Sequence, residues 1–66
     1  KEVFLNNATI LAICHNQPTN NPNPSKNDDL LTNQINKACQ IMRIFFMDHV
    51  IITDGAFYSY HDKGKL

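Results

Sequence analysis

The chain has 66 residues, six basic and six acidic side chains, no formal net charge and 42% hydrophobic residues. A chain of this length forms at most one domain, and because such a domain buries only about 60% of the surface of its unfolded form, its core has little margin. The basic residues are scattered along the sequence, so no clustered phosphate-binding surface for nucleic acid is evident.

The chain also lacks the marks of a membrane or secreted protein. Its longest apolar run, residues 10–14, is far shorter than a membrane span, and no signal-peptide pattern precedes it, so we expect a soluble cytoplasmic protein. Cys14 and Cys39 do not make a disulfide framework, and we expect reduced thiols. Because the chain begins with Lys1 instead of Met, and its first segment resembles the tail of a helix, we expect a fragment.

The first two predicted elements are a helix end and a strand. Residues 1–6 supply apolar side chains followed by Asn6 and Asn7, and asparagine tolerates the left-handed conformation that ends helices. Residues 9–14 form a nearly unbroken apolar run rich in β-branched side chains. Such a run predicts a strand buried on both faces, in the middle of an α/β sheet.

A polar loop and a long helix follow. Residues 15–24 contain three prolines, which exclude a helix or a central strand, and ligand sites in open α/β sheets favour this place after a buried strand. Ser25 opens a predicted helix that runs to about Ile44, with Asp28 completing a capping box. Its apolar stripe consists of Leu31, Ile35, Ala38 and Met42, broadened by Leu30, Cys39 and Ile41.

The last third of the sequence predicts a β-hairpin. Residues 45–49 lead into a strand over residues 50–53, with Phe45, Phe46 and Met47 as core or interface side chains. Asp54 and Gly55 suit a type I′ turn, because both central positions need a positive φ. Residues 56–60 return antiparallel, and residues 61–66 form a polar tail with His61 at the surface.

Three residues near the predicted loop have side chains suited to chemistry. His15 leaves the buried strand, Ser25 opens the helix and Asp28 lies in its first turn. A histidine and a carboxylate brought together could bind a divalent metal, and a serine hydroxyl could donate to an oxyanion. The same residues have a structural explanation, since Ser25 and Asp28 cap the helix and a lone histidine is more often structural. From the residues alone, both interpretations stay open.

Residues 15–28, HNQPTNNPNPSKND, are similar to the HxHPxxxxPxxSxxD-type loop of the RadC family, within the JAMM (JAB/MPN) metalloprotease superfamily. The likeness extends to residues 1–4, 7–8, 31–32, 47–52, 54–55 and 58–59. It covers essentially the whole chain without gaps. It implies an α/β fold, namely a three-layer α/β/α cytidine-deaminase-like domain of which residues 1–66 are the C-terminal part.

The resemblance assigns roles to individual residues. The first zinc histidine falls on His15, the oxyanion-side serine on Ser25 and the zinc aspartate on Asp28, whereas the second zinc histidine falls on Gln17. The family's water-activating glutamate precedes this sequence, and Glu2 matches a different, solvated position. Residues 19–20 also depart from the Ser-Gly of the family, which affects the tight backbone path of the loop.

Gln17 changes the expected chemistry. Catalytic zinc needs three protein ligands and an open position for water, and imidazole nitrogen is a good donor for it. A glutamine amide oxygen is neutral and harder, so it binds zinc more weakly. We therefore expect zinc to be bound weakly or not at all, and any metal-bound water to be poorly acidified.

Two hypotheses follow from the resemblance. The first is a zinc-dependent hydrolase domain, acting on peptide or isopeptide bonds, with an impaired metal site. The alternative is a non-catalytic protein-interaction module that retains the fold. Bacterial RadC proteins are commonly labelled DNA repair proteins, and this label reaches the present chain only by association. Neither nucleic-acid binding nor membrane binding is expected of this segment. A homo-oligomer fits the apolar hairpin, and Asp48 with His49 is expected to be a structural pair.

Overall fold

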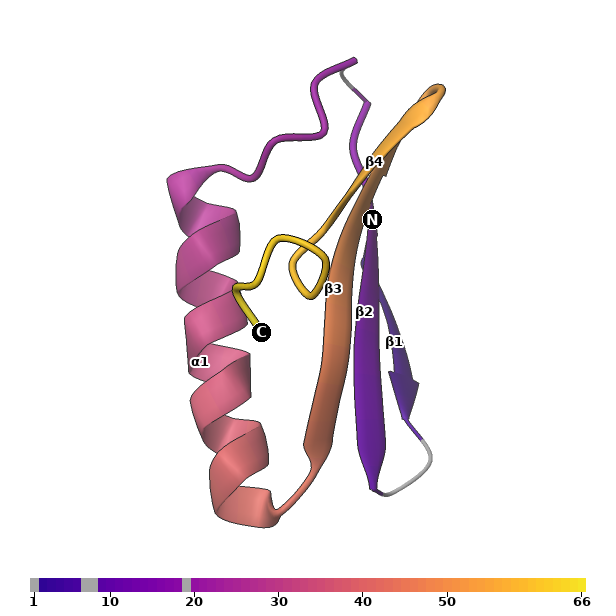
Figure 1. Ribbon diagram of the computed structural model, residues 1–66. Coiled ribbons are helices and arrows are strands. Elements are labelled where there is room, and N and C mark those ends of the chain that lie inside the picture. The colour runs from indigo at the N-terminus through magenta and orange to yellow at the C-terminus, as the bar shows by residue number, and fades with distance from the viewer. Residues whose placement is uncertain (1, 7–8, 19) are drawn as a thin grey trace.

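The computed structural model describes residues 2–6, 9–18 and 20–66, and of residues 2–6 it describes the backbone. One helix packs against one face of a four-stranded sheet with the order β1-β2-β3-β4 (Figure 1). In chain order the elements are β1 (Glu2–Asn6), β2 (Ile10–Asn16), α1 (Lys26–Met42), β3 (Phe45–Thr53) and β4 (Ala56–Ser59). The α/β class is as predicted, and the described residues form two layers.

The central unit is β2–α1–β3. The two strands are parallel, with pairs running from Ile10 and Phe45 to Asn16 and Ile52, and with a register shift between Leu11 and Ala12. Parallel strands need a long crossover, and here the helix supplies it. The carboxyl ends of both strands and the amino end of α1 therefore meet at one end of the domain.

The predicted helix end at residues 1–6 is wrong, because residues 2–6 are strand β1. This strand pairs antiparallel with β2, from Glu2 opposite His15 to Asn6 opposite Leu11. A run of consecutive apolar residues without a 3.6-residue period suits a strand next to a buried neighbour better than a helix. Lys1 and Asn7, which entered the helix prediction, lie outside the described residues.

Helix α1 begins and ends close to its predicted bounds, and its capping box is confirmed. Its buried face differs from the predicted stripe: Ala38 is exposed, and Met42 is 60% exposed. The buried residues are instead Asp28, Thr32 and Cys39. Polar side chains take part in this face because they meet polar partners on the sheet, and an apolar pattern cannot reveal such partners.

The hairpin forms at the predicted place, with Thr53 opposite Ala56, but the predicted type I′ turn is wrong. Gly55 has a φ of 83°, whereas Asp54 lacks the positive φ that a type I′ turn needs at both central positions, because that conformation costs a residue with a Cβ more than it costs glycine. The segment after β4 is more than a polar tail. Tyr60 is 2% exposed, and Leu66 packs against both buried clusters of the core. The end of the chain therefore covers part of the interface between α1 and the sheet.

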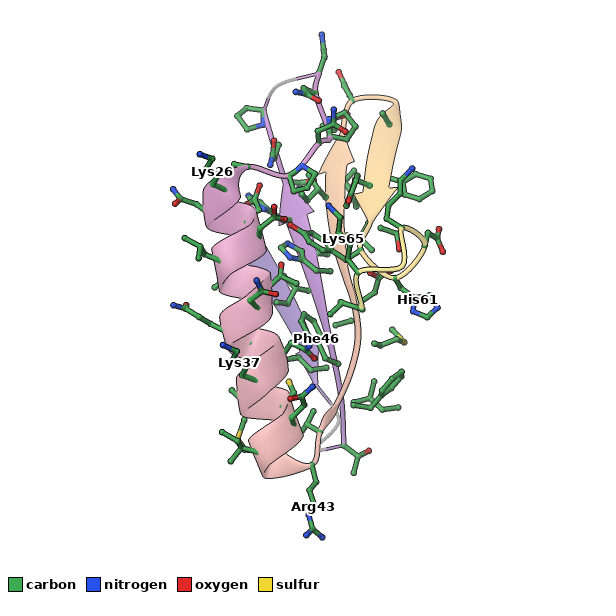
Figure 2. The ribbon with its side chains drawn as sticks, turned by 60° about the vertical axis from the view of Figure 1, so that its left-hand side comes forward. Lys26, Lys37, Arg43, Phe46, His61 and Lys65 are labelled. Atoms are coloured by element: carbon green, nitrogen blue, oxygen red, sulfur yellow. The ribbon has the colours of Figure 1, made fainter. Side chains whose placement is uncertain are left out.

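The core lies between α1 and the sheet, and Figure 2 shows Phe46 there with Lys26 and Lys37 on the outer side of the helix. The two buried clusters consist of Ile13, Cys39 and Phe46, and of Ile51, Tyr58 and Tyr60. The thiols of Cys14 and Cys39 are free.

Large apolar side chains on the sheet remain exposed. Ile52 and Phe57 are partners across the hairpin, and by strand alternation they face away from the buried pair Ile51 and Tyr58. Phe45 is 59% and Met47 is 47% exposed. No helix in the described part of the chain is long and apolar enough to cross a membrane.

Candidate functional site

The structure brings the four residues singled out by sequence together at the end where β2 stops and α1 starts. His15 lies near the end of β2, and Gln17 follows that strand with its backbone N–H donating to the Ile52 carbonyl at 2.9 Å. Ser25 is the N-cap of α1, and Asp28 lies in the first turn. In the loop between them, the Asn21 side chain accepts a hydrogen bond from the backbone of Asn23 at 3.1 Å.

The Asp28 carboxylate is the centre of this group and is 7% exposed. Its Oδ2 accepts hydrogen bonds from the Ser25 backbone N–H at 2.8 Å and from the Gln17 amide nitrogen at 3.2 Å. Its backbone N–H donates to the Ser25 hydroxyl at 3.1 Å. Its Oδ1 lies 3.4 Å from Nδ1 of His15. One carboxylate thus contacts the strand, the loop and the helix cap.

His15 faces Asp28 without forming a regular hydrogen bond. Its Nδ1 is buried and has no hydrogen-bond partner, although it lies within ion-pair distance of Asp28 Oδ1. The two groups therefore pair electrostatically when the imidazole is protonated. The ring also lies over His49, with centroids 6.1 Å apart and planes at 20°.

The pKa of Asp28 lies below its ordinary value of 3.8. Burial is the largest influence and raises the pKa, but the backbone and side-chain hydrogen bonds of Ser25 and the charges of His15 and His49 together lower it further. The amino end of α1 also favours a negative charge at this place. The protein therefore stabilises the ionised carboxylate with its own groups.

The residues present do not fit a three-ligand zinc site. Among residues 2–6, 9–18 and 20–66, no group of three His, Cys, Asp or Glu side chains gathers closely enough to hold a metal ion. His15 and Asp28 are suitable donors, but Gln17 turns its NH₂ group toward the carboxylate. An amide nitrogen in this position donates a hydrogen bond and cannot act as a metal ligand.

A buried polar layer lies beneath the site. The Thr32 hydroxyl donates to the Asp28 carbonyl at 2.8 Å, and its oxygen lies 2.6 Å from Nδ1 of His49. Because the one hydroxyl proton is used by the carbonyl, Nδ1 of His49 must carry a proton and donate to Thr32. His49 is fully buried and stacks on Tyr60, with ring centroids 4.9 Å apart.

This layer supports the interpretation of Asp48 and His49 as a structural pair and adds contacts that the sequence did not reveal. Asp48 has the expected structural role, because it accepts hydrogen bonds from Ser59 and from the backbone N–H groups of His49 and His61. His49 does more than pair with its neighbour, since it touches His15 of the candidate site. Thr32 was missed, although its spacing of four from Asp28 places both on one helix face.

The comparisons with known proteins place the sequence within a family. A family model described as a RadC-like JAB domain matches residues 1–65. A UPF0758 protein of Flavobacterium johnsoniae is 42% identical over 59 residues, which are 89% of this chain and 26% of that protein. A UPF0758 protein of Thermotoga maritima is 35% identical over 60 residues, 91% of this chain and 27% of that protein. The chain thus spans about a quarter of these relatives.

The hydroxyl of Thr32 is expected to stabilise the fold. Thr32→Val leaves the Nδ1–H of His49 without this acceptor, and a buried unsatisfied donor costs about 1–3 kcal/mol. Thr32→Ser keeps the hydroxyl and is expected to lose less stability. Denaturant unfolding of both variants measures the difference, and equal stability of the valine and serine variants would contradict the assigned hydrogen bond.

Asp28 is expected to make stability depend on pH. A carboxyl with a lowered pKa in the folded state contributes stability above its unfolded pKa, near 3.8, and loses it as the pH falls through the folded value. The difference in free energy of unfolding between the natural chain and Asp28→Asn should therefore shrink below pH 3.8. Exposed Asp62→Asn is the control, and a pH-independent difference for Asp28→Asn would refute the pKa shift.

Proposed function

Because this chain belongs to the RadC-like JAB domain family, we propose that it is a hydrolase-type domain whose zinc site is impaired. The chemistry proposed for the intact protein is hydrolysis of peptide or isopeptide bonds, carried out weakly or not at all by this version of the site. The observation that carries the proposal is the hydrogen bond from Gln17 to Asp28, 3.2 Å long.

This hydrogen bond competes directly with a metal. A zinc ion that used Asp28 Oδ2 would have to displace the Gln17 amide, or Gln17 would have to rotate and present its carbonyl oxygen. Rotation of the Gln17 amide removes a hydrogen-bond donor from Asp28, which is 7% exposed. A buried carboxylate that lacks hydrogen-bond donors is energetically unfavourable. The metal would gain only a neutral oxygen in return. Both routes lower the affinity for zinc.

Ser25 keeps a role in the proposal. Its oxygen accepts the Asp28 backbone N–H at 3.1 Å, and its hydroxyl proton, which helps to hold the Asp28 carboxyl ionised, would turn to a substrate acceptor. Ser25 is exposed, so a substrate carbonyl oxygen can approach it. We assign it the donor position beside a developing oxyanion, in addition to its role as helix cap.

The three-layer α/β/α arrangement is also part of the proposal. The described residues supply one helical layer and the sheet, and exposed apolar side chains such as Phe45 and Phe57 occupy the other sheet face. A second helical layer on that face would bury them. Since the chain spans 26–27% of its relatives, the activity, substrates and any link to DNA repair concern the whole protein and remain proposals.

A non-catalytic interaction module is the second candidate. The favouring observation is that Asp28 is satisfied by Ser25 and Gln17 without a metal, so the fold can persist after the chemistry is lost. The exposed apolar sheet face would then serve contact with another protein or with a second copy of the chain. Measured zinc affinity distinguishes this module from an active hydrolase.

The decisive variant is Gln17→His, made in the intact protein that carries this sequence. A third ligand, and the second imidazole of the set, should tighten zinc binding by more than roughly 100-fold, because the loss of an outer-shell partner alone costs about 10–100-fold. Isothermal titration with zinc measures stoichiometry and affinity for both forms. The natural chain is expected to bind weakly.

Two controls test whether a gain in zinc affinity comes from an imidazole at residue 17. Gln17→Ala removes the hydrogen bond without adding a ligand, and Gln34→His adds an imidazole on an exposed part of α1. Neither should reproduce the gain of Gln17→His. Tight one-to-one binding by the natural chain would overturn the impaired-site proposal. If Gln17→His gains nothing, the assignment of the loop residues as a metal site is wrong.

A further inference from the structure

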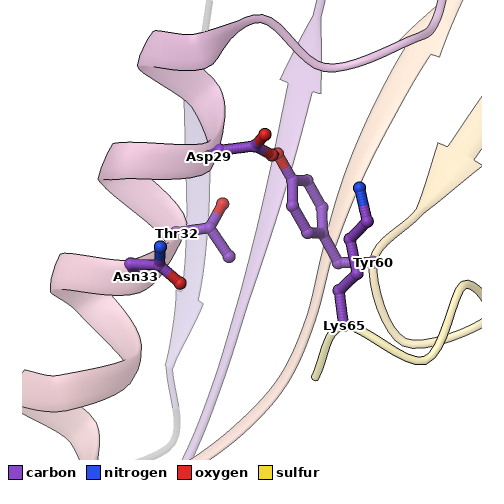
Figure 3. A pocket seen from close by; sticks show the side chains of 5 residues that line it. All are labelled: Asp29, Thr32, Asn33, Tyr60 and Lys65. Carbon is purple, nitrogen blue, oxygen red and sulfur yellow. The ribbon is translucent and has the colours of Figure 1, made fainter.

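A polar pocket lies beside the candidate site, between α1 and the segment after β4 (Figure 3). Its volume is about 340 Å³, near the lower end of the roughly 300–1,000 Å³ typical of small-molecule sites. The lining residues are Asp29, Thr32, Asn33, Tyr60 and Lys65. None of the four sequence-predicted site residues lines it.

The acidic side of the pocket is Asp29. Its Oδ1 accepts the Tyr60 hydroxyl at 2.8 Å, which fixes the carboxylate at the pocket edge. Burial raises the pKa of Tyr60, and the hydrogen bond to Asp29 raises it further. The phenol therefore stays neutral and orients the carboxylate without cancelling its charge. Among the residues that the structure describes, none donates a hydrogen bond to the second carboxylate oxygen, so this oxygen can accept one from a ligand.

The basic side is Lys65. Its Nζ lies 5.4 Å from the ring centroid of Tyr58 and 5.9 Å from that of Tyr60, within cation–π range. Hydrogen bonding with Tyr58 is the main influence that raises the pKa of Lys65, so the ammonium stays charged. Figure 3 shows the lysine extending alongside the Tyr60 ring. Two tyrosines thus hold an otherwise exposed lysine at the pocket.

The two opposite charges attract each other but do not form a direct ion pair. Within the described part of the chain, no ion pair within 4.0 Å joins Asp29 to Lys65, and the one such pair is that of His15 with Asp28. Thr32 contributes no free hydroxyl proton, because its proton goes to the Asp28 carbonyl. Asn33 is exposed and offers an amide with both donor and acceptor atoms.

We propose that this pocket binds a small zwitterion, with an ammonium group at Asp29 and a carboxylate at Lys65. A ligand with a single charge would leave one of the two protein charges uncompensated, whereas a zwitterion matches both. Asn33 can hydrogen-bond either end. Two sources carry this chemistry, a free amino acid and a short peptide with charged termini. The inference goes beyond the proposed hydrolase-type function, because it uses none of the zinc-site side chains.

The test is an NMR-detected titration of the intact protein with L-alanine and with L-alanyl-L-alanine, in zinc-free buffer. Chemical-shift changes that saturate are expected at the pocket residues. The compound that binds more tightly shows whether the natural ligand is a free amino acid or a short peptide. N-acetyl-L-alanine lacks the cation and L-alaninamide lacks the carboxylate. Each should bind at least about tenfold more weakly, the effect of losing one charged hydrogen bond.

Matched variants connect binding to the pocket. Asp29→Asn keeps an oxygen for the Tyr60 hydroxyl but removes the charge, and Lys65→Gln removes the ammonium. Both should weaken binding by at least about tenfold. Asp62→Asn and Lys63→Gln make the same charge changes at exposed residues outside the pocket lining, and they should bind as the natural chain does.

The zwitterion proposal is overturned if neither zwitterion saturates, if the blocked compounds bind equally well, or if the lining variants behave like the controls. Because no zinc is present and Gln17 is unchanged, such a failure leaves the impaired-site proposal standing. Conversely, tight zinc binding by the natural chain would not affect this pocket.

Discussion

Asp28 places a negative charge at the buried end of the interface between α1 and the sheet, where an uncompensated carboxylate would be costly. The protein compensates it with the Ser25 N–H, the Gln17 amide and the nearby His15 ring. These contacts start the helix, attach the loop to it and place the strand end beside it. The carbonyl of the same residue then anchors Thr32. The candidate site exists because several segments share one carboxylate.

In this arrangement Gln17 has a structural role as well as a chemical one. In a metal site, the residue at this position would contribute a lone pair toward a shared cation. Here it contributes a proton donor toward the anion itself, so the negative charge is satisfied within the chain. In this arrangement the carboxylate has its hydrogen-bond donors within the chain itself. The proposed impairment of the metal site is therefore compatible with membership of the family.

Much of the fold could be predicted from the sequence because local patterns determine it. The capping box at Ser25 and the place of the hairpin at Gly55 depend on neighbouring residues only, and both are confirmed. The type I′ conformation was wrong, because Asp54 does not take up the positive φ that it requires. Strand β1 was mistaken for a helix because its conformation depends on pairing with β2, which a short apolar run does not reveal. The buried face of α1 was misplaced because Thr32 is buried by a hydrogen bond to His49 and not by apolarity.

The candidate site was predicted more fully than its surroundings. A motif resemblance identified His15, Gln17, Ser25 and Asp28, and the structure brings them together. It could not identify Asp29, Tyr60 or Lys65, because these come from a helix turn and a chain end that meet only in the fold. Their roles follow from geometry. The hydroxyl of buried Tyr60 donates a hydrogen bond to Asp29, and the Tyr60 ring lies within cation–π distance of Lys65.

The most direct test of the central claim is a crystal structure of the intact protein with stoichiometric zinc, with anomalous diffraction at the zinc edge. The Gln17 amide nitrogen is expected still to donate to Asp28, and no zinc signal is expected between His15 and Asp28. A zinc ion held by His15 and Asp28, with the Gln17 carbonyl oxygen turned toward it, would contradict the impaired-site proposal.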